Sequence, residues 1–180
     1  MMADQLKNNL VRLRALEPED VDILYRWEND IDVWKVSNTI APFSKYILRQ
    51  FIENQKYDIY ETKQLRLIIE ALETQKPVGT IDLFDIDPYN LRAGVGILIY
   101  DRNDHKRGYA SGAVSLLIRY CFQILGLNQL YCNITAGNND SMALFRSKGF
   151  HVIGLKKEWT RTTCDWQEEY MLQLLNPKKY

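Results

Sequence analysis

The sequence predicts an α/β fold with a mixed central sheet of six to seven strands and about four helices. Two observations predict it: apolar segments of strand length alternate along the chain with longer segments whose apolar residues recur at helical spacing. The chain has 180 residues, 46% of them hydrophobic, which suffices for one core, and no repeat or long linker divides it. We therefore expect a single domain over residues 1–180.

The first part of the chain is predicted to form one strand and two helices. The strand covers residues 10–15, and a helix then opens at residues 17–20, where a proline and three acids suit the positive end of a helix dipole. A second helix begins at residues 42–44. The side chains expected to pack beneath these helices are Val21, Leu24, Tyr25, Trp27, Tyr46, Ile47, Leu48, Phe51 and Ile52.

The remaining elements continue the alternation. Turn signals at residues 74–77 and 87–90 separate the middle strands. The expected strands cover residues 65–71, 78–86, 94–100, 130–135, 151–156 and 168–175, and the expected helices cover residues 108–125 and 138–148. The order β-α-α-β-β-β-α-β-α-β-β predicts a sheet of mixed direction.

Composition excludes several classes of function. Lys plus Arg and Asp plus Glu both number 23, so the formal net charge is zero, and neither nucleic-acid nor membrane binding is expected. No stretch approaches the roughly 18 consecutive apolar residues of a membrane span. Residues 1–9 are polar and resemble neither a signal peptide nor an anchor, so a cytoplasmic protein is expected.

The metal and thiol chemistry of the chain is also limited. Its three cysteines, Cys121, Cys132 and Cys164, have wide spacings that suit neither a disulfide framework nor a zinc site. Cys121 and Cys132 lie in apolar segments and are interpreted as small core residues. The chain has only two histidines, and we expect no metal.

The segment whose pattern most clearly indicates a function covers residues 94–125. An apolar strand there leads through a polar loop into a helix that starts at Gly108, just after Lys106 and Arg107. The first N–H groups of a helix have no internal partner and, with the dipole, form an anion site. Gly108, Ala110 and Gly112 would let a diphosphate approach the backbone. An ordinary turn before a core helix explains this segment alone equally well.

Two motifs in this order resemble the GNAT superfamily of acyl-CoA-dependent acetyltransferases. Residues 105–110, His-Lys-Arg-Gly-Tyr-Ala, resemble the motif Q/R-x-x-G-x-G/A, with His105 in place of the usual Gln or Arg. Residues 138–150 resemble a second motif that begins with Asn and ends with Gly-Phe. The resemblance covers residues 9–175 and is closest to the branch of diamine (spermidine) and ribosomal-protein N-terminal acetyltransferases.

The resemblance implies a GNAT fold whose sheet is splayed at an acetyl-CoA site. In such proteins the free edge of the strand before the loop pairs with the pantetheine arm, and the loop holds the diphosphate. The residues that would bind acetyl-CoA are Leu98, Ile99, Tyr100, His105, Lys106, Arg107, Gly108, Tyr109, Ala110, Ser111, Asn138 and Phe145. Asn138 equally suits a helix N-cap, and both roles are compatible.

The reaction implied is direct attack of a neutral amine on the thioester, which needs a base and an acid for the thiolate. The family often has a tyrosine acid where this chain has Phe145, so the proton would come from water, Tyr100 or Ser141. The family often has a glutamate where this chain has Gly94-Val95. Asp82 is therefore the candidate base or ammonium anchor, with solvent exposure as the equally weighted alternative.

The acceptor site is expected near the end of the first helix. Glu28, Asp30 and Asp32 could join Asp82 and Asp85 in an acidic mouth for a polyamine. Trp34 could line it, whereas a solvated acidic surface is the plainer explanation. Three functions stay open: acetylation of a small primary amine, acetylation of protein N-termini, and non-catalytic acyl-CoA binding. Related enzymes range from monomers to rings, so a homo-oligomer is among the allowed states.

Overall fold

The computed structural model describes residues 5–37, 39–162 and 164–177, and its seven strands form one sheet in the order β1-β2-β3-β4-β5-β7-β6. All neighbouring strands are antiparallel except β4 and β5, which run parallel, so the predicted mixed sheet is confirmed. The strands are β1 (Val11–Arg14), β2 (Leu65–Ala71), β3 (Lys76–Asp87), β4 (Arg92–Ile99), β5 (Gln129–Thr135), β6 (His151–Arg161) and β7 (Trp166–Leu175).

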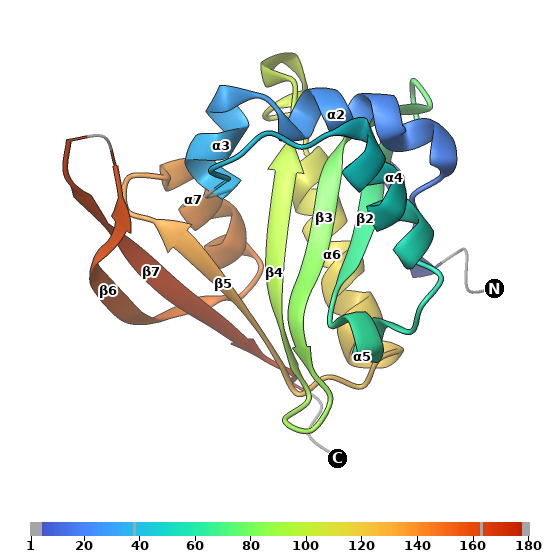
Figure 1. Cartoon of the computed structure of the whole chain (residues 1–180). Helices are drawn as coiled ribbons and strands as arrows, with labels where there is room; N and C mark the ends of the chain where they lie inside the picture. Colours follow the sequence, from blue (N-terminus) through green and yellow to red (C-terminus); the bar gives the residue numbers. More distant parts are fainter. Residues whose placement is uncertain (1–4, 38, 163, 178–180) are drawn as a thin grey trace.

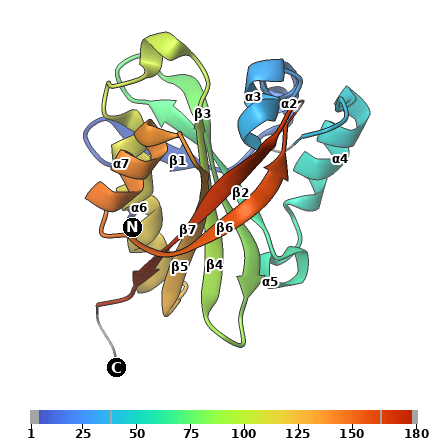
Figure 2. The same ribbon diagram turned by 90° about the vertical axis from the view of Figure 1, so that its left-hand side faces the viewer.

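Helices cover both faces of the sheet (Figures 1 and 2). One face carries α6 (Tyr109–Gln123) and α7 (Asn139–Ser147), and the other carries α2 (Val21–Glu28), α3 (Ile31–Ser37), α4 (Lys45–Asn54) and α5 (Ile59–Thr62). Two short 3-10 turns, η1 (Pro18–Asp20) and η2 (Arg102–Asp104), complete the described elements. The estimate of about four helices missed α3 and α5, because elements of seven and four residues are too short to show an apolar period.

The helices on the α2 face bury fewer of their apolar residues than predicted. Val21, Leu24 and Trp27 are buried as expected, but Tyr25 is 40% exposed, since it lies away from the stripe that the other three form along α2. On α4, Leu48 and Ile52 are buried. The predictions for Tyr46 and Ile47 were wrong, because these side chains lie on the outer surface of α4.

The main core lies between the sheet and the buried stripe of α6. Ala113, Val114, Leu117 and Cys121 face the sheet from α6 and are at most 1% exposed. Cys132 on β5 joins them, and burial raises the pKa of its thiol to about 12. Both cysteines are therefore core residues, as predicted, and a nucleophilic thiolate at either position is disfavoured.

Strands β4 and β5 separate soon after they begin, so the predicted splay of the sheet is confirmed. They pair only at Arg92↔Gln129, Ala93↔Leu130 and Gly94↔Tyr131. On its other side, β4 stays paired with β3 as far as Ile99. From Val95 onward, β4 has no strand partner on the β5 side, and Figure 1 shows β5 diverging from it. None of the helices in the described ranges has the length and apolar character that a membrane span requires.

Candidate active site

The open edge of β4 ends beside the loop that leads into α6. The Tyr100 N–H donates to the Val78 carbonyl on β3 at 3.0 Å. Because the peptide bond is planar and trans, the Ile99 carbonyl points the opposite way, to the open side. There the His105 ring nitrogen Nε2 lies 3.0 Å from the Ile99 oxygen. His105 thus joins the loop to the edge of β4, a contact that Gln or Arg would make differently.

The N-terminus of α6 is shaped for close approach by a ligand. Its N-cap is Gly108, in the left-handed region at φ 82°, and no side chain caps the helix. The positive φ favours glycine here, and a Cβ would also crowd the Leu10 side chain at 3.2 Å. The main-chain N–H groups of Tyr109, Ala110 and Ser111 therefore remain available to an anion.

The loop side chains differ in how they can contribute. Lys106 is exposed, whereas Arg107 pairs with Glu73 at 3.0 Å and with Asp104 at 3.6 Å. The ring of Tyr109 is buried, so only its backbone can face a cofactor. Gly112 has a packing role: a Cβ there would meet the Asn8 side chain at 2.9 Å, so this glycine lets α6 pack against the segment before β1, and its expected role toward a diphosphate stays a prediction.

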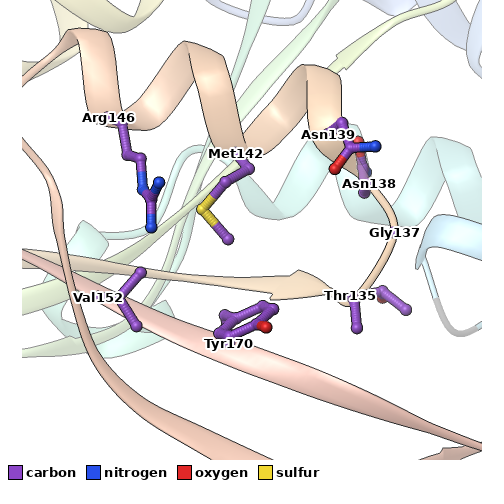
Figure 3. A pocket seen from close by; sticks show the side chains of 9 residues that line it. Thr135, Gly137, Asn138, Asn139, Met142, Arg146, Val152 and Tyr170 are labelled. Atoms are coloured by element: carbon purple, nitrogen blue, oxygen red, sulfur yellow. The ribbon is translucent and has the colours of Figure 1, made fainter.

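The second motif forms α7 and its N-cap. The Asn138 side chain accepts a hydrogen bond from the Ser141 N–H at 3.1 Å, so the capping role is confirmed. Phe145 is buried and packs edge-to-face on Phe150. A pocket of about 270 Å³ lies between α7 and strands β5, β6 and β7. Figure 3 shows its lining, with Asn138 at one end and Arg146 at the other.

On the opposite face of the sheet, Asp82 belongs to a cluster of three charged side chains. The Arg66 guanidinium on β2 donates to the two Asp82 oxygens at 2.6 and 3.4 Å, and a further Arg66 nitrogen donates to Glu28 at the end of α2. The three side chains are only 14–19% exposed. The alternative that Asp82 is an exposed surface residue is therefore wrong.

The surroundings of Asp82 favour a carboxylate that can take up a proton. Burial raises the pKa of Asp82 above its usual value, Arg66 opposes this rise, and Glu28 adds to it. Asp82 pairs across the sheet with Gly96, on the stretch of β4 that β5 has left. A Cβ at Gly96 would meet nothing closer than 3.8 Å, so β4 presents bare backbone beside the carboxylate.

Tyr100 connects the end of β4 to the loop between α2 and α3. Its hydroxyl donates to Asp30 at 3.0 Å, and its ring stacks on Trp27 with centroids 5.6 Å apart. The hydrogen bond to Asp30 is the main reason why the pKa of Tyr100 is raised. The Trp34 indole donates to the Glu28 carbonyl at 2.6 Å, which fixes the end of α2. Glu28, Asp30 and Trp34 thus meet at one end of β4.

The structure does not bring Asp85 into this group. Asp85 is an exposed residue at φ 49° within the irregular part of β3, and it accepts a hydrogen bond from the Tyr131 hydroxyl at 3.2 Å. It lines a separate open pocket of about 850 Å³ at the start of β4, with Lys63, Arg92 and Lys156. Of the acids expected to form the acidic mouth, Glu28, Asp30 and Asp82 lie near one another, whereas Asp32 lies at the surface 3.7 Å from Arg102 and Asp85 lies apart.

A sheet splayed between β4 and β5 and a glycine-capped helix at the open edge are the features that the resemblance to the GNAT superfamily implied. The family described as acetyltransferase (GNAT) domain matches residues 11–151, and the chain belongs to it. Its catalytic class is that of an acetyl-CoA-dependent N-acetyltransferase.

Two relatives and one solved structure are similar to this chain over most of its length. An uncharacterised N-acetyltransferase of Bacillus licheniformis is 32% identical over 175 residues, covering 96% of each chain. The spermidine N(1)-acetyltransferase of Escherichia coli K12 is 27% identical over 147 residues, covering 80% of this chain and 74% of that protein. The structure of Vibrio cholerae spermidine N-acetyltransferase with CoA and spermine superposes with a TM-score of 0.83 at 21% identity, covering 93% of this chain and 96% of that one.

Sequence reasoning missed two residues of this site, Arg66 and Gly96. Arg66 is a basic residue in an apolar strand, and Asp82 is an acidic residue in the next strand, which was a usable signal for a cross-strand pair. The register shift between Ile69 and Glu70 prevented that pairing from being counted from the turn. Gly96 gave no signal of its own, because only the packing shows that a Cβ there would make ordinary contacts with Phe84 and Asp82 and no clash.

Proposed function

We propose that this protein is a single acetyltransferase domain that transfers the acetyl group of acetyl-CoA to a primary amine of a small polyamine or amino compound. The observation that carries the proposal is the open edge of β4. It lies between a glycine-capped helix start at Gly108 and a half-buried carboxylate at Asp82. If acetyl-CoA bound along that edge, its diphosphate would lie at the start of α6. The amine would approach the thioester from the side of Asp82.

The cofactor side is supported by main-chain groups. The N–H groups that open α6 and the positive charges of Lys106 and Arg107 would hold the diphosphate. Of the expected strand residues Leu98, Ile99 and Tyr100, the Tyr100 N–H is already bonded to Val78 on β3, so the open-side backbone of Ile99 would pair with the pantetheine arm as a further strand would. Asn138, at the start of α7, completes the proposed set, with its oxygen already used as the helix cap.

The amine side is supported by Asp82. An ammonium must lose a proton before its nitrogen can attack the thioester carbon, and a carboxylate with a raised pKa is better suited to accept that proton. As the new C–N bond forms and the C–S bond breaks, the electron pair leaves on sulfur. A thiol has a pKa of about 8.5, so the thiolate can depart and be protonated by water.

Tyr100 is less suited to act as the acid that protonates the thiolate. Its hydroxyl already donates to Asp30, and its pKa is raised by that bond. We assign Tyr100 instead to the wall between the loop and the acceptor site, where it stacks on Trp27. Ser141, in the first turn of α7, and water remain the proposed proton donors.

Self-association is proposed from the outer strand of the sheet. Strand β6 lies at the sheet edge with several large apolar side chains at least 37% exposed: Val152, Ile153, Leu155 and Trp159. Such a surface suits a second copy of the chain, so we propose a homo-oligomer. Light scattering coupled to size exclusion tests this, and a monomer at all concentrations would contradict it. The proposed location of the protein is the cytoplasm.

An assay with acetyl-CoA tests the proposed reaction. The acceptors are spermidine, diamines, amino sugars and peptides with free N-termini, and we expect turnover with the small amines. Preference for the peptides would instead indicate a protein N-terminal acetyltransferase. Tight CoA binding without turnover of any amine would indicate a non-catalytic module. Within the described ranges, no cluster of His, Cys, Asp or Glu is arranged to bind a metal. Samples with and without chelator test whether the reaction needs one.

Replacing Asp82 by Asn tests the role of the carboxylate. The amide keeps the shape of the side chain but cannot take up a proton, so turnover should fall by about 100-fold or more. The affinity for CoA, measured by calorimetry, should stay within about threefold of wild type, because Asp82 lies on the acceptor side. An unchanged rate would remove Asp82 from the reaction.

A further inference from the structure

Arg66 is the centre of the charged cluster beside the open edge of β4. Its guanidinium contacts two carboxylates from different elements, Asp82 on β3 and Glu28 at the end of α2. Its flat face also lies over the ring of Phe51 on α4, 5.4 Å from the ring centroid. One side chain therefore connects the sheet to α2 and α4, two of the helices on this face.

The cluster does not balance its own charge. One guanidinium stands against two carboxylates, so one negative charge is left over when both carboxylates are ionised. Gly96, the residue of β4 that pairs with Asp82, has no side chain that could compensate it. Confining two carboxylates in a half-buried site disfavours their ionisation unless a cation holds them.

We infer that Arg66 is a positioning residue for the acceptor: it holds the Asp82 and Glu28 carboxylates in place, and their surplus negative charge receives the ammonium head of the substrate. The inference rests on the proposed function and narrows it to acceptors that carry a single cation at the reacting end. An ammonium head neutralises the cluster as it binds. A neutral or acidic head would leave the surplus charge buried beside it.

The chemistry of the cluster changes in a defined way when Arg66 is removed. In the wild type, Arg66 lowers the pKa of Asp82 against the effects of burial and of Glu28. Without that guanidinium, the two remaining acids face each other and the pKa of Asp82 rises further. The ionised fraction at a given pH then falls, so the acid limb of the rate profile moves to higher pH.

The experiment compares wild type with Arg66→Met and Arg66→Lys in steady-state assays with the amine turned over best. For Arg66→Met we expect kcat/KM for the amine to fall by about 100-fold and the acid limb of its pH profile to move up by about one unit. Arg66→Lys keeps the positive charge but loses the bidentate guanidinium. Its kcat/KM should therefore be about tenfold higher than that of Arg66→Met, and the acid limb of its pH profile should lie where it does in the wild type.

Two further measurements separate positioning from loss of structure. Calorimetric CoA affinity should stay within about threefold of wild type in both variants, because the cofactor side is untouched. If Arg66→Met does not fold, Arg66→Lys alone decides: a raised KM for the amine with an unshifted limb supports the inference. An unchanged KM and profile in either folded variant overturns it.

Failure of the inference differs from failure of the proposed function. A wild type that binds CoA but acetylates no amine overturns both. If the wild type is active and Arg66→Lys lowers the rate by the same factor for charged and uncharged acceptors, only the inference is overturned. In that case the role of Arg66 would be structural, holding α2 against the sheet.

Discussion

Two arginine clusters on this protein are built alike and differ in charge. In the first, which we call the β1 cluster, Arg14 donates to Asp20 at 2.7 and 2.9 Å and to Glu70 at 3.0 Å. Arg12 adds a second guanidinium, 2.7 Å from Glu70. Two arginines thus face two carboxylates, whereas the cluster around Arg66 has one arginine for two carboxylates.

The carboxylates respond in opposite directions. In the β1 cluster, burial acts to raise the pKa of Asp20 and Glu70, but hydrogen bonds from Arg14 and Arg12 outweigh it and both pKa values are lowered. In the Arg66 cluster, burial dominates and the pKa of Asp82 is raised. A balanced cluster stabilises the fold, whereas an unbalanced one beside open space can take part in binding and proton transfer.

The largest effect should come from filling the space beside the unbalanced cluster. In Gly96→Ala the new methyl group meets only ordinary contacts of 3.8 Å and beyond, so the fold should persist. The methyl group would nevertheless stand where the amine approaches β4, and we expect kcat to fall by about 100-fold. Gly94→Ala is the matched contrast, because its Cβ would meet the Phe84 ring at 2.2 Å and should reduce stability as well. Full activity in Gly96→Ala would place the acceptor elsewhere.

A smaller effect, on stability alone, is expected from the balanced cluster. Asp20→Asn should lower the free energy of unfolding in urea at pH 7 by about 2 kcal/mol, because it weakens two charged hydrogen bonds to Arg14. The KM for the amine should not change. A raised KM in a folded Asp20→Asn variant would break the distinction between the clusters.

The same variant has a defined dependence on pH. The folded-state pKa of Asp20 is lowered, so its contribution to stability is present above the unfolded pKa and is lost as pH falls through the folded value. The difference between wild type and Asp20→Asn should therefore be constant near neutrality and shrink below about pH 4. Urea titrations at several pH values measure this, and a difference that grows on acidification would contradict it.

The smallest effect concerns Arg107, an arginine that also pairs with two carboxylates. Its side chain is 44% exposed, so water screens the pairs and they contribute little to stability. Arg107→Glu should weaken CoA binding by at least about tenfold, or 1.4 kcal/mol, because it places a negative charge beside the proposed diphosphate. Glu73→Gln, which removes the exposed partner, is the control and should not weaken binding. Equal CoA affinity in Arg107→Glu and wild type would count against the position of the loop.

The sequence was sufficient to predict the sheet and the elements on which the proposed cofactor site stands, because most of these depend on local patterns. The stripe of α6, the loop before Gly108 and the cap at Asn138 are local features, and the splay was implied by the family resemblance. The acceptor side depends on which strands meet. The pairing of Arg66 with Asp82 lies beyond a register shift from the turn, and Asp85 stands at a positive φ within a second register shift, between Phe84 and Asp87. No periodicity in the sequence records either feature.

The central claim is that a surplus negative charge at Glu28, Arg66 and Asp82 holds the ammonium of the acceptor. Calorimetric titration of spermidine into the CoA-bound protein tests it with wild type and Glu28→Gln, which keeps the shape and removes the surplus charge. We predict that Glu28→Gln weakens spermidine binding by at least about tenfold while CoA affinity stays the same. Equal affinity of both proteins for spermidine would contradict the claim.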